Sequence, residues 1–131
     1  MIALLAACVA GPGEGELVPV DTGAFFAEVE PVLGERCANP ACHGSADRPL
    51  EVYAEHRHRL DTGDAWRDLP LTPDEHAANL LRARGFAGPP YAIARKGLAP
   101  EAGGMGHGGG AIWLSADEPE YAAILAWAEG R

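Results

Sequence analysis

The sequence predicts a single, mostly helical domain with long loops and no β-strand. The chain has 131 residues, a length typical of one domain. Apolar residues recur at helical spacing in several segments, and no alternation with a period of two is long enough for a strand. Glycine (17 residues) and proline (11 residues) are frequent, which predicts short helices joined by long loops.

The first helix is predicted over residues 22–36. Asp21 or Thr22 can cap its N-terminus, because short polar side chains accept hydrogen bonds from the first free N–H groups. Pro31 lies inside the helix and should kink it, since proline removes one backbone hydrogen bond. The helix has an apolar stripe at helical spacing, formed by Phe25, Phe26, Val29, Val32 and Leu33.

Two further helices are expected in the middle of the chain. The weaker one spans Pro49 to about Leu60, with an apolar face of Leu50, Tyr53, Ala54 and Leu60. The other begins at residues 72–75, which form a capping box with proline at the first helical position. We expect Leu80 and Leu81 to form its buried face and Gly85 to end it.

The C-terminal part of the chain combines a glycine loop with a last helix. Residues 103–110 include six glycines, so this stretch predicts a loop whose backbone approaches another group closely. The last helix should begin near Asp117, with Ser115 and Glu118 as a second capping box, and should end at Gly130. Its inner face is predicted to hold Tyr121, Ile124, Leu125 and Trp127.

The charge pattern excludes one large class of partners. The formal net charge is -9, and no run of lysine or arginine occurs. Nucleic acid is therefore not expected as a partner, because binding to phosphates needs a basic surface. No apolar stretch of the sequence approaches the roughly 20 residues of a membrane-spanning helix.

The N-terminus predicts export and a lipid anchor. Residues 1–8 end in Leu-Ala-Ala-Cys, which is similar to the lipobox of bacterial lipoproteins. Cys8 would then be lipidated, and residues 1–8 would be a truncated signal because they lack a basic segment. Residues 9–20 have the composition of a flexible tether, and residues 21–131 form the folded domain.

The stretch CANPACHG, residues 37–44, contains the chemistry that stands out most. Two cysteines followed directly by a histidine are typical of c-type haem attachment, in which the usual gap between the cysteines is two residues. Here the gap is four. Asn39-Pro40 is a turn-forming pair, so the two additional residues can bulge outward and leave Cys42 and His43 adjacent. The histidine would then be an axial ligand of the iron.

Other chemistries fit the same residues. A Cys37–Cys42 disulfide is geometrically possible in a turn of this length. Zinc could bind Cys37, Cys42 and His43 with one further ligand, although adjacent ligands are awkward for one tetrahedral ion and a second pair is missing. A redox-sensing or catalytic thiol pair is a further alternative. The motif alone therefore leaves haem, disulfide and zinc open.

The glycine loop favours haem, because it offers a second axial ligand. Met105 and His107 lie two residues apart there, and the surrounding glycines allow close approach of the backbone to a porphyrin face. Either residue alone could be an ordinary loop residue, and their position downstream of a Cys-Cys-His motif makes a ligand role the better interpretation.

With these motifs the chain resembles the small c-type cytochrome domains of myxobacteria and planctomycetes. The resemblance covers roughly residues 25–130 and is specific at its two ends. It rests on the Cys-x4-Cys-His motif, on Lys96 to Leu98, on the His-Gly-Gly segment at His107, and on the spacing of Tyr121, Ile124 or Leu125, and Trp127. The resemblance implies a cytochrome c-like helical fold with long loops around one haem.

The resemblance also implies residue roles. Cys37 and Cys42 would form the thioether bonds to one covalent haem c, and His43 would be the proximal ligand. His107 is the favoured distal ligand, with Met105 as the alternative. Methionine opposite histidine would give a higher reduction potential than two histidines. In such a fold the first and last helices cross, so Phe25 or Phe26 should meet Tyr121 or Trp127.

The expected function is one-electron transfer in the cell envelope, in the periplasm or at a lipid-anchored position. The protein would be an electron carrier, not an enzyme, and its partners would be other redox proteins. The alternative from a different class is a haem-free, exported interaction module stapled by a disulfide or zinc. A third possibility is a peroxidase-like accessory domain with an open sixth site.

For the remaining histidines, for Lys96 and for two tryptophans, the sequence predicts structural or solvent-exposed positions. His56 and His58 should be solvated, because residues two apart on a helix face different directions. His76 has no obvious partner, and Lys96 should face solvent or pair with a haem propionate. Trp66 and Trp113 are expected in the core or the haem pocket.

Overall fold

The computed structural model describes residues 17–131, so the predicted signal, the lipidation at Cys8 and most of the tether lie outside the described residues. The described part is mostly helical and contains no strand, as predicted; one isolated bridge joins Leu98 and Trp113. None of its helices is long and apolar enough to cross a membrane. In residues 17–20, the Val18 carbonyl accepts a hydrogen bond from Arg84.

The first predicted helix is one helical run with four segments: α1 (Thr22–Ala24), η1 (Phe25–Val29), α2 (Glu30–Val32) and η2 (Leu33–Cys37). The Asp21 carboxylate accepts a hydrogen bond from the Ala24 N–H, which confirms the predicted cap. Both η segments are π-helical, with i to i+5 hydrogen bonds. They flank Pro31, so the backbone register changes around the residue that cannot donate a hydrogen bond.

Helix α3 (Pro73–Arg84) has the predicted boundaries. Thr72 and Glu75 form the capping box, and Gly85 is the C-terminal cap. The predicted buried face is wrong, because Leu81 is exposed and Leu80 only half-buried. The helix instead buries Glu75, Asn79 and Ala83, four residues apart. Polar groups fill this face because each has a specific partner elsewhere in the fold.

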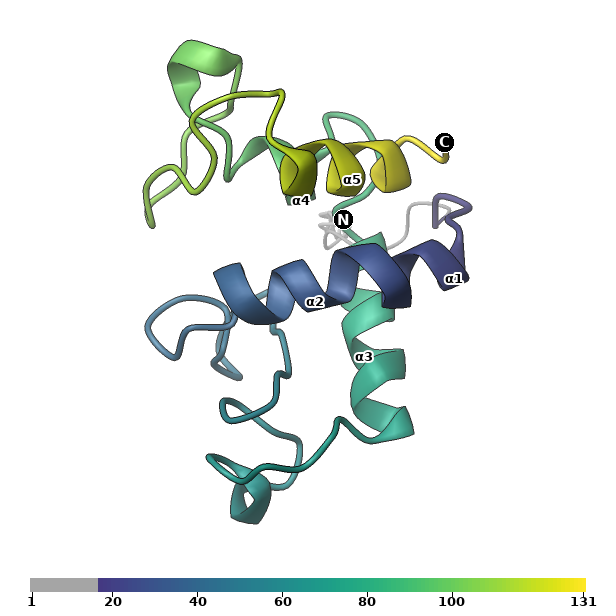
Figure 1. Ribbon diagram of the computed structural model, residues 1–131, viewed down its shortest axis with the longest axis vertical. Coiled ribbons are helices and arrows are strands. Elements are labelled where there is room, and N and C mark those ends of the chain that lie inside the picture. Colours follow the sequence, from purple (N-terminus) through teal and green to yellow (C-terminus); the bar gives the residue numbers. More distant parts are fainter. Residues whose placement is uncertain (1–16) are drawn as a thin grey trace, which may run out of the picture.

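The last helix, α5 (Pro119–Ala128), packs along the first helical run (Figure 1). The Phe25 and Trp127 ring centroids are 5.2 Å apart, so the expected aromatic contact is present. Trp127 also donates a hydrogen bond to the Asp21 carbonyl. The predicted capping box is half present: the Glu118 carboxylate accepts a hydrogen bond from the Ser115 N–H, but Ser115 Oγ accepts from the Asp117 N–H and not from Glu118, which is itself the N-cap.

The helix predicted at residues 49–60 does not form. Residues 51–54 are buried, and the backbone N–H groups of two of them form hydrogen bonds with residues outside the segment. Val52 N–H donates to the His43 carbonyl, and Tyr53 N–H donates to the Asn79 side chain. These long-range bonds replace the i to i+4 bonds of a helix, and His56 with φ 58° is incompatible with one.

Short helical turns complete the fold: η3 (Thr62–Asp64), α4 (Ala92–Arg95) and η4 (Pro100–Ala102). The glycine stretch 103–110 is irregular, as predicted. Long connections, residues 38–72 and 85–118, extend from the packed helices on the same side of the molecule (Figure 1). The candidate site lies between these two connections.

Candidate functional site

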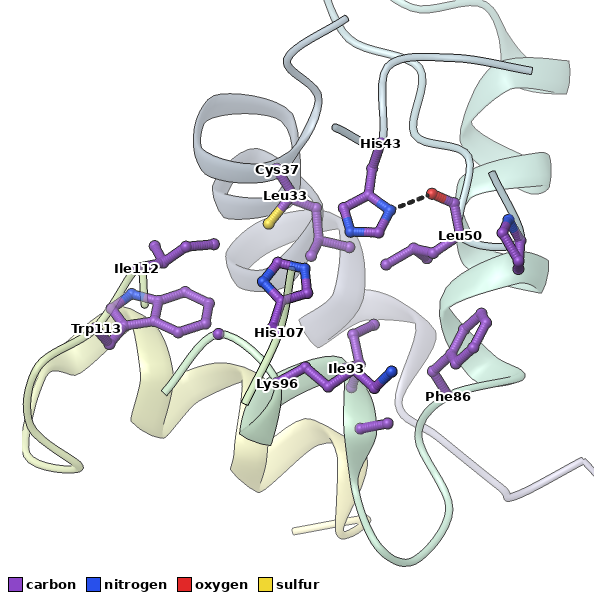
Figure 2. A pocket seen from close by; sticks show the side chains of 13 residues that line it. Leu33, Cys37, His43, Leu50, Phe86, Ile93, Lys96, His107, Ile112 and Trp113 are labelled. Atoms are coloured by element: carbon purple, nitrogen blue, oxygen red, sulfur yellow. Dashed lines mark hydrogen bonds between the residues drawn. The ribbon is translucent and has the colours of Figure 1, made fainter. Parts of the chain in front are cut away.

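One apolar pocket lies between the first helical run, α4 and the two long connections (Figure 2). Its volume is about 170 Å³, while sites for small organic molecules usually span about 300–1,000 Å³. A larger flat ligand would therefore require one wall to move outward. The lining residues come from both halves of the chain: Leu33, Cys37, His43, Pro49, Leu50, Phe86, Ala92, Ile93, Lys96, Gly97, His107, Ile112 and Trp113.

The turn predicted at Asn39-Pro40 is present and positions His43. The Asn39 carbonyl accepts hydrogen bonds from the Cys42 and Gly44 N–H groups, and the Asn39 side chain accepts one from Ala41. His43 N–H donates to the Cys37 carbonyl. The four residues between the cysteines thus close into a compact turn directly after η2 (Leu33–Cys37).

The His43 ring is fixed in one tautomer. Its Nδ1 lies 2.8 Å from the Leu50 carbonyl oxygen, which can only accept, so Nδ1 carries the proton. Burial lowers the pKa of His43, and this outweighs the hydrogen bond to Leu50. The ring is therefore neutral at physiological pH, and Nε2 has a free lone pair, as a metal ligand requires.

His107 faces His43 across the pocket (Figure 2). Its Nδ1 lies 3.2 Å from the Gly110 carbonyl oxygen, so Nε2 of this ring is also left as the acceptor. The two rings are nearly parallel, with 9° between their planes and 5.9 Å between their centroids. The sequence placed these histidines 64 residues apart, and the fold brings them to one pocket.

This spacing fits two imidazoles on opposite sides of one metal ion. Metal–nitrogen bonds to imidazole are about 2 Å long, and a ring centroid lies about 1 Å behind its nitrogen, so the centroids would be about 6 Å apart. The two imidazoles, each with a free Nε2, are donors that a transition metal accepts. The enclosed volume of about 170 Å³ does not hold a whole porphyrin.

The two cysteines differ in their surroundings. Cys37 is buried and lines the pocket, and burial, followed by the nearby Cys42, raises the pKa of its thiol to about 11. Cys42 is half-buried and does not line the pocket. Both are free thiols. A protonated, buried thiol disfavours a redox-active thiol pair.

Zinc also lacks a ligand set at this position. Within residues 17–131, the only group of three potential ligands close to one another is Glu55, His56 and Asp68, all exposed and away from the pocket. Cys37, Cys42 and His43 do not form such a group.

Met105 lies outside the pocket and is 43% exposed. Its N–H donates to the Arg95 carbonyl, which holds this residue at the base of the loop. Lys96 is exposed at the pocket rim and Trp113 is buried in its wall, as expected for the latter. Of the two candidate distal ligands, the structure brings only His107 to His43.

The prediction for Trp66 is wrong, since this side chain is 71% exposed. His56 is exposed, as predicted. His58 is not: it is half-buried, hydrogen-bonded to Glu51 and stacked on Tyr53. These contacts form because residues 51–58 fold back on themselves instead of forming a helix.

His76 does have a partner, contrary to expectation. Its Nδ1 lies 2.7 Å from Oε2 of the buried Glu30. Asn79 donates to the other oxygen of Glu30. Because Glu30 belongs to the first helical run and His76 to α3, sequence spacing gave no signal for this pairing.

Sequence reasoning also missed a polar cluster behind the pocket wall. Glu120 accepts two hydrogen bonds from Arg36 and one from the Trp113 indole N–H. These hydrogen bonds lower the pKa of Glu120, and the bond from Arg36 has the larger effect. The cluster joins the end of the first helical run, next to Cys37, to the start of α5 and so supports the wall formed by Trp113.

Gly44 should not tolerate a side chain. A Cβ atom there would lie 2.2 Å from the Ala38 carbonyl oxygen, so the turn that holds His43 must open. We expect Gly44→Ala to lower the free energy of unfolding by about 1–3 kcal/mol, measured by urea denaturation. Gly108→Ala is the matched control, because no atom lies within 4 Å of its Cβ position. Equal midpoints for the two variants would contradict the close packing at Gly44.

Comparisons of the chain with protein-family models, with curated proteins and with solved structures gave no match. The functional assignment therefore rests on the motif and on the geometry of the pocket.

Proposed function

We propose that this chain is a single-haem c-type cytochrome domain that transfers one electron at a time. The observation that supports this most strongly is the pair of nearly parallel imidazoles, His43 and His107, 5.9 Å apart in an apolar pocket. Both rings donate from Nδ1 to a backbone carbonyl, so both Nε2 atoms remain available as ligands. The arrangement favours His107 over Met105 as the distal ligand.

The chain's own residues have distinct roles in this proposal. Cys37 and Cys42 would hold the haem through thioether bonds, and the turn between them keeps them close enough for this. His43 and His107 would be the ligands of its iron. The covalent haem would supply a one-electron iron couple. Lys96, exposed at the rim, is placed to pair with a propionate.

The apolar wall of the pocket would also exclude water. Apolar side chains form most of it, and Trp113, which is 1% exposed, closes one side. A dry surrounding is one of the factors by which a protein sets the potential of a haem. The long connections 38–72 and 85–118 contribute His43, Leu50, Phe86 and His107, which supports a cytochrome-like domain with loops around the group.

The cellular setting follows from the motif and is part of the same proposal. The domain would work in the cell envelope, with other redox proteins as donor and acceptor. The lipobox-like sequence before Cys8 would tether it to a membrane. The domain would have no substrate of its own.

Covalent haem content tests this function. The protein, exported to a periplasm together with a haem maturation system, should be red and carry the mass of one haem. Cys37→Ser with Cys42→Ser should abolish the covalent addition, and His56→Ala, a change at an exposed histidine, should preserve it. A colourless protein with a Cys37–Cys42 disulfide, or with stoichiometric zinc, would instead establish the haem-free interaction module.

A further inference from the structure

Three side chains that can bind a metal ion meet on the surface of the connection 38–72, away from the pocket between His43 and His107. Glu55, His56 and Asp68 each offer one ligand atom, and these atoms all lie within 4.8 Å of one another. Within residues 17–131 no other three histidine, cysteine, aspartate or glutamate side chains come this close. These three residues are here named the loop cluster, and none of them lines the pocket.

The backbone on both sides of the loop cluster is fixed to the body of the fold. Arg57, next to His56, donates hydrogen bonds to two carbonyls near the end of the first helical run. Arg59 donates to the carbonyl of Leu69, which follows Asp68. The three side chains therefore extend from backbone that is already held in place, and this lowers the cost of ordering them around an ion.

The loop cluster is short of positive charge. Its two carboxylates lie close together and repel each other, and within the described chain neither forms an ion pair with a lysine or an arginine. The arginines between residues 55 and 68 bond to other groups: Arg57, Arg59 and Arg67. The contact between His56 Nε2 and Asp68 Oδ1 is 3.3 Å long, whereas a good hydrogen bond of this kind measures about 2.7–3.2 Å. A bound cation would supply the missing charge.

We propose that the loop cluster binds one divalent transition-metal ion such as zinc, through one oxygen each of Glu55 and Asp68 and one ring nitrogen of His56. Zinc bonds to such ligands are about 2.0–2.2 Å long, so two ligand atoms at a tetrahedral angle lie about 3.4 Å apart. This is close to the 3.3 Å between His56 and Asp68. The imidazole favours zinc or a similar ion over calcium and magnesium, which prefer oxygen ligands alone. Water would complete the coordination, because the Asp68 side chain is 93% exposed.

The ion would link the two ends of a surface loop. Residues 57–67 contain one short helical turn, η3, and expose Leu60 and Trp66. The ligands Glu55 and His56 precede this loop and Asp68 follows it, so a bound ion closes it. An ion that binds only the folded chain stabilises it by mass action, and zinc should therefore raise the urea midpoint. This inference is independent of the proposed function, since its ligands lie at a different site.

Isothermal titration calorimetry of the full chain, freed of divalent metal by a chelator, tests the site with zinc alone. The wild-type chain should bind zinc, and the double variant Cys37→Ser, Cys42→Ser should keep this binding. His56→Ala and Asp68→Asn should each weaken the affinity about 10- to 100-fold or more, since even changes next to the ligands of a metal cost this much. A wild-type chain that binds no zinc would overturn the site. Binding that His56→Ala leaves unchanged and the cysteine variant abolishes would place the ion at the cysteines instead.

Asp117→Asn is the matched control for charge. Asp117 is exposed, does not belong to the loop cluster, and loses the same negative charge as Asp68 does in Asp68→Asn. At about 0.15 M salt its variant should bind zinc within about twofold of the wild-type affinity, because charges outside the ligand set are screened. Equal weakening by the two substitutions would show a general attraction of zinc to an acidic protein and would overturn the site.

Nuclear magnetic resonance locates the ion independently of its affinity. On addition of zinc the ring signals of His56, assigned by their loss in His56→Ala, should shift. Those of His58 should move much less, because its Nε2 is already bonded to Glu51 and its ring is stacked on Tyr53. Shifts confined to His58 or to His76 would place the zinc elsewhere and would overturn the assignment.

Discussion

Replacing His107 by alanine should convert the oxidised, haem-loaded protein completely from low spin to high spin, whereas Met105→Ala should leave its spectrum unchanged. The His107 ring lies 5.9 Å from that of His43, and its loss leaves only water or no ligand on that side. Met105 lies outside the pocket and is 43% exposed, so its removal changes no ligand. Optical and electron paramagnetic resonance spectra measure the spin state.

The two variants are matched, because both shorten a side chain in the same loop and differ only in the expected ligand. The wild-type oxidised protein should also lack the near-infrared band of methionine-ligated haem, and its potential should be lower than that of a His–Met centre. A low-spin His107→Ala together with a high-spin Met105→Ala would move the ligand to Met105.

The elements that sequence patterns predicted well are stabilised by neighbours in the chain. Helix α3 (Pro73–Arg84) has the predicted bounds because the capping box and proline at its start and the glycine at its end each act on neighbouring residues. The Asn39-Pro40 turn is local in the same way. The class of the fold and the pairing of Phe25 with Trp127 followed from apolar spacing and from a family resemblance.

The elements that were predicted wrongly depend on contacts between distant residues. The segment 49–60 has the spacing of a weak helix, but the Asn79 side chain bonds to both the N–H and the carbonyl of Tyr53. Arg57 donates to the Gly34 and Glu35 carbonyls. No local pattern encodes such partners, and they outweigh the small helix propensity of this stretch.

In the candidate site, too, local sequence patterns predicted some features, and contacts between distant residues determine the others. Motif spacing indicated Cys37, Cys42, His43, Met105 and His107, and the fold gathers Cys37, His43 and His107 at one pocket. The Leu50 carbonyl, which fixes the His43 tautomer, is a backbone group and leaves no trace in the side-chain pattern. The choice between Met105 and His107 depends on where the loop turns.

Replacing Arg59 by methionine should lower the free energy of unfolding by about 3–5 kcal/mol, because it leaves the Glu75 carboxylate buried without its charged partner. The two side chains are each 1% exposed and their nitrogen and oxygen atoms lie 2.8 Å apart. Arg59 also donates to the Leu69 and Pro70 carbonyls, so one guanidinium holds α3 and the loop before it together.

Arg67→Met is the matched control. Arg67 forms an ion pair with Asp64 at 3.3 Å, but its side chain is 62% exposed, and exposed pairs contribute only about 0–1 kcal/mol. Urea unfolding of the two variants at pH 7 compares a buried with an exposed pair for the same substitution. If Arg59→Met lost no more stability than Arg67→Met, the buried pair would not hold this part of the fold.

The same pair predicts how stability depends on pH. Burial alone would raise the pKa of Glu75, but hydrogen bonds from Arg59 and from the Thr72 and Leu60 N–H groups lower it from 4.5 to about 2. A carboxyl with a depressed pKa stabilises the fold above its unfolded pKa, and this contribution, roughly 3 kcal/mol, is lost as the pH falls from about 4.5 to 2.

Glu75→Gln replaces the titrating carboxyl by an amide, which keeps the shape of the side chain but has no charge. Urea unfolding at pH 7, 4 and 2.5 should show a large difference between wild type and variant at pH 7 that shrinks as the pH falls. All other titratable groups are present in both proteins, so their contributions cancel in the comparison. A difference that stays constant over this range would mean that Glu75 has the same pKa in the folded and the unfolded protein.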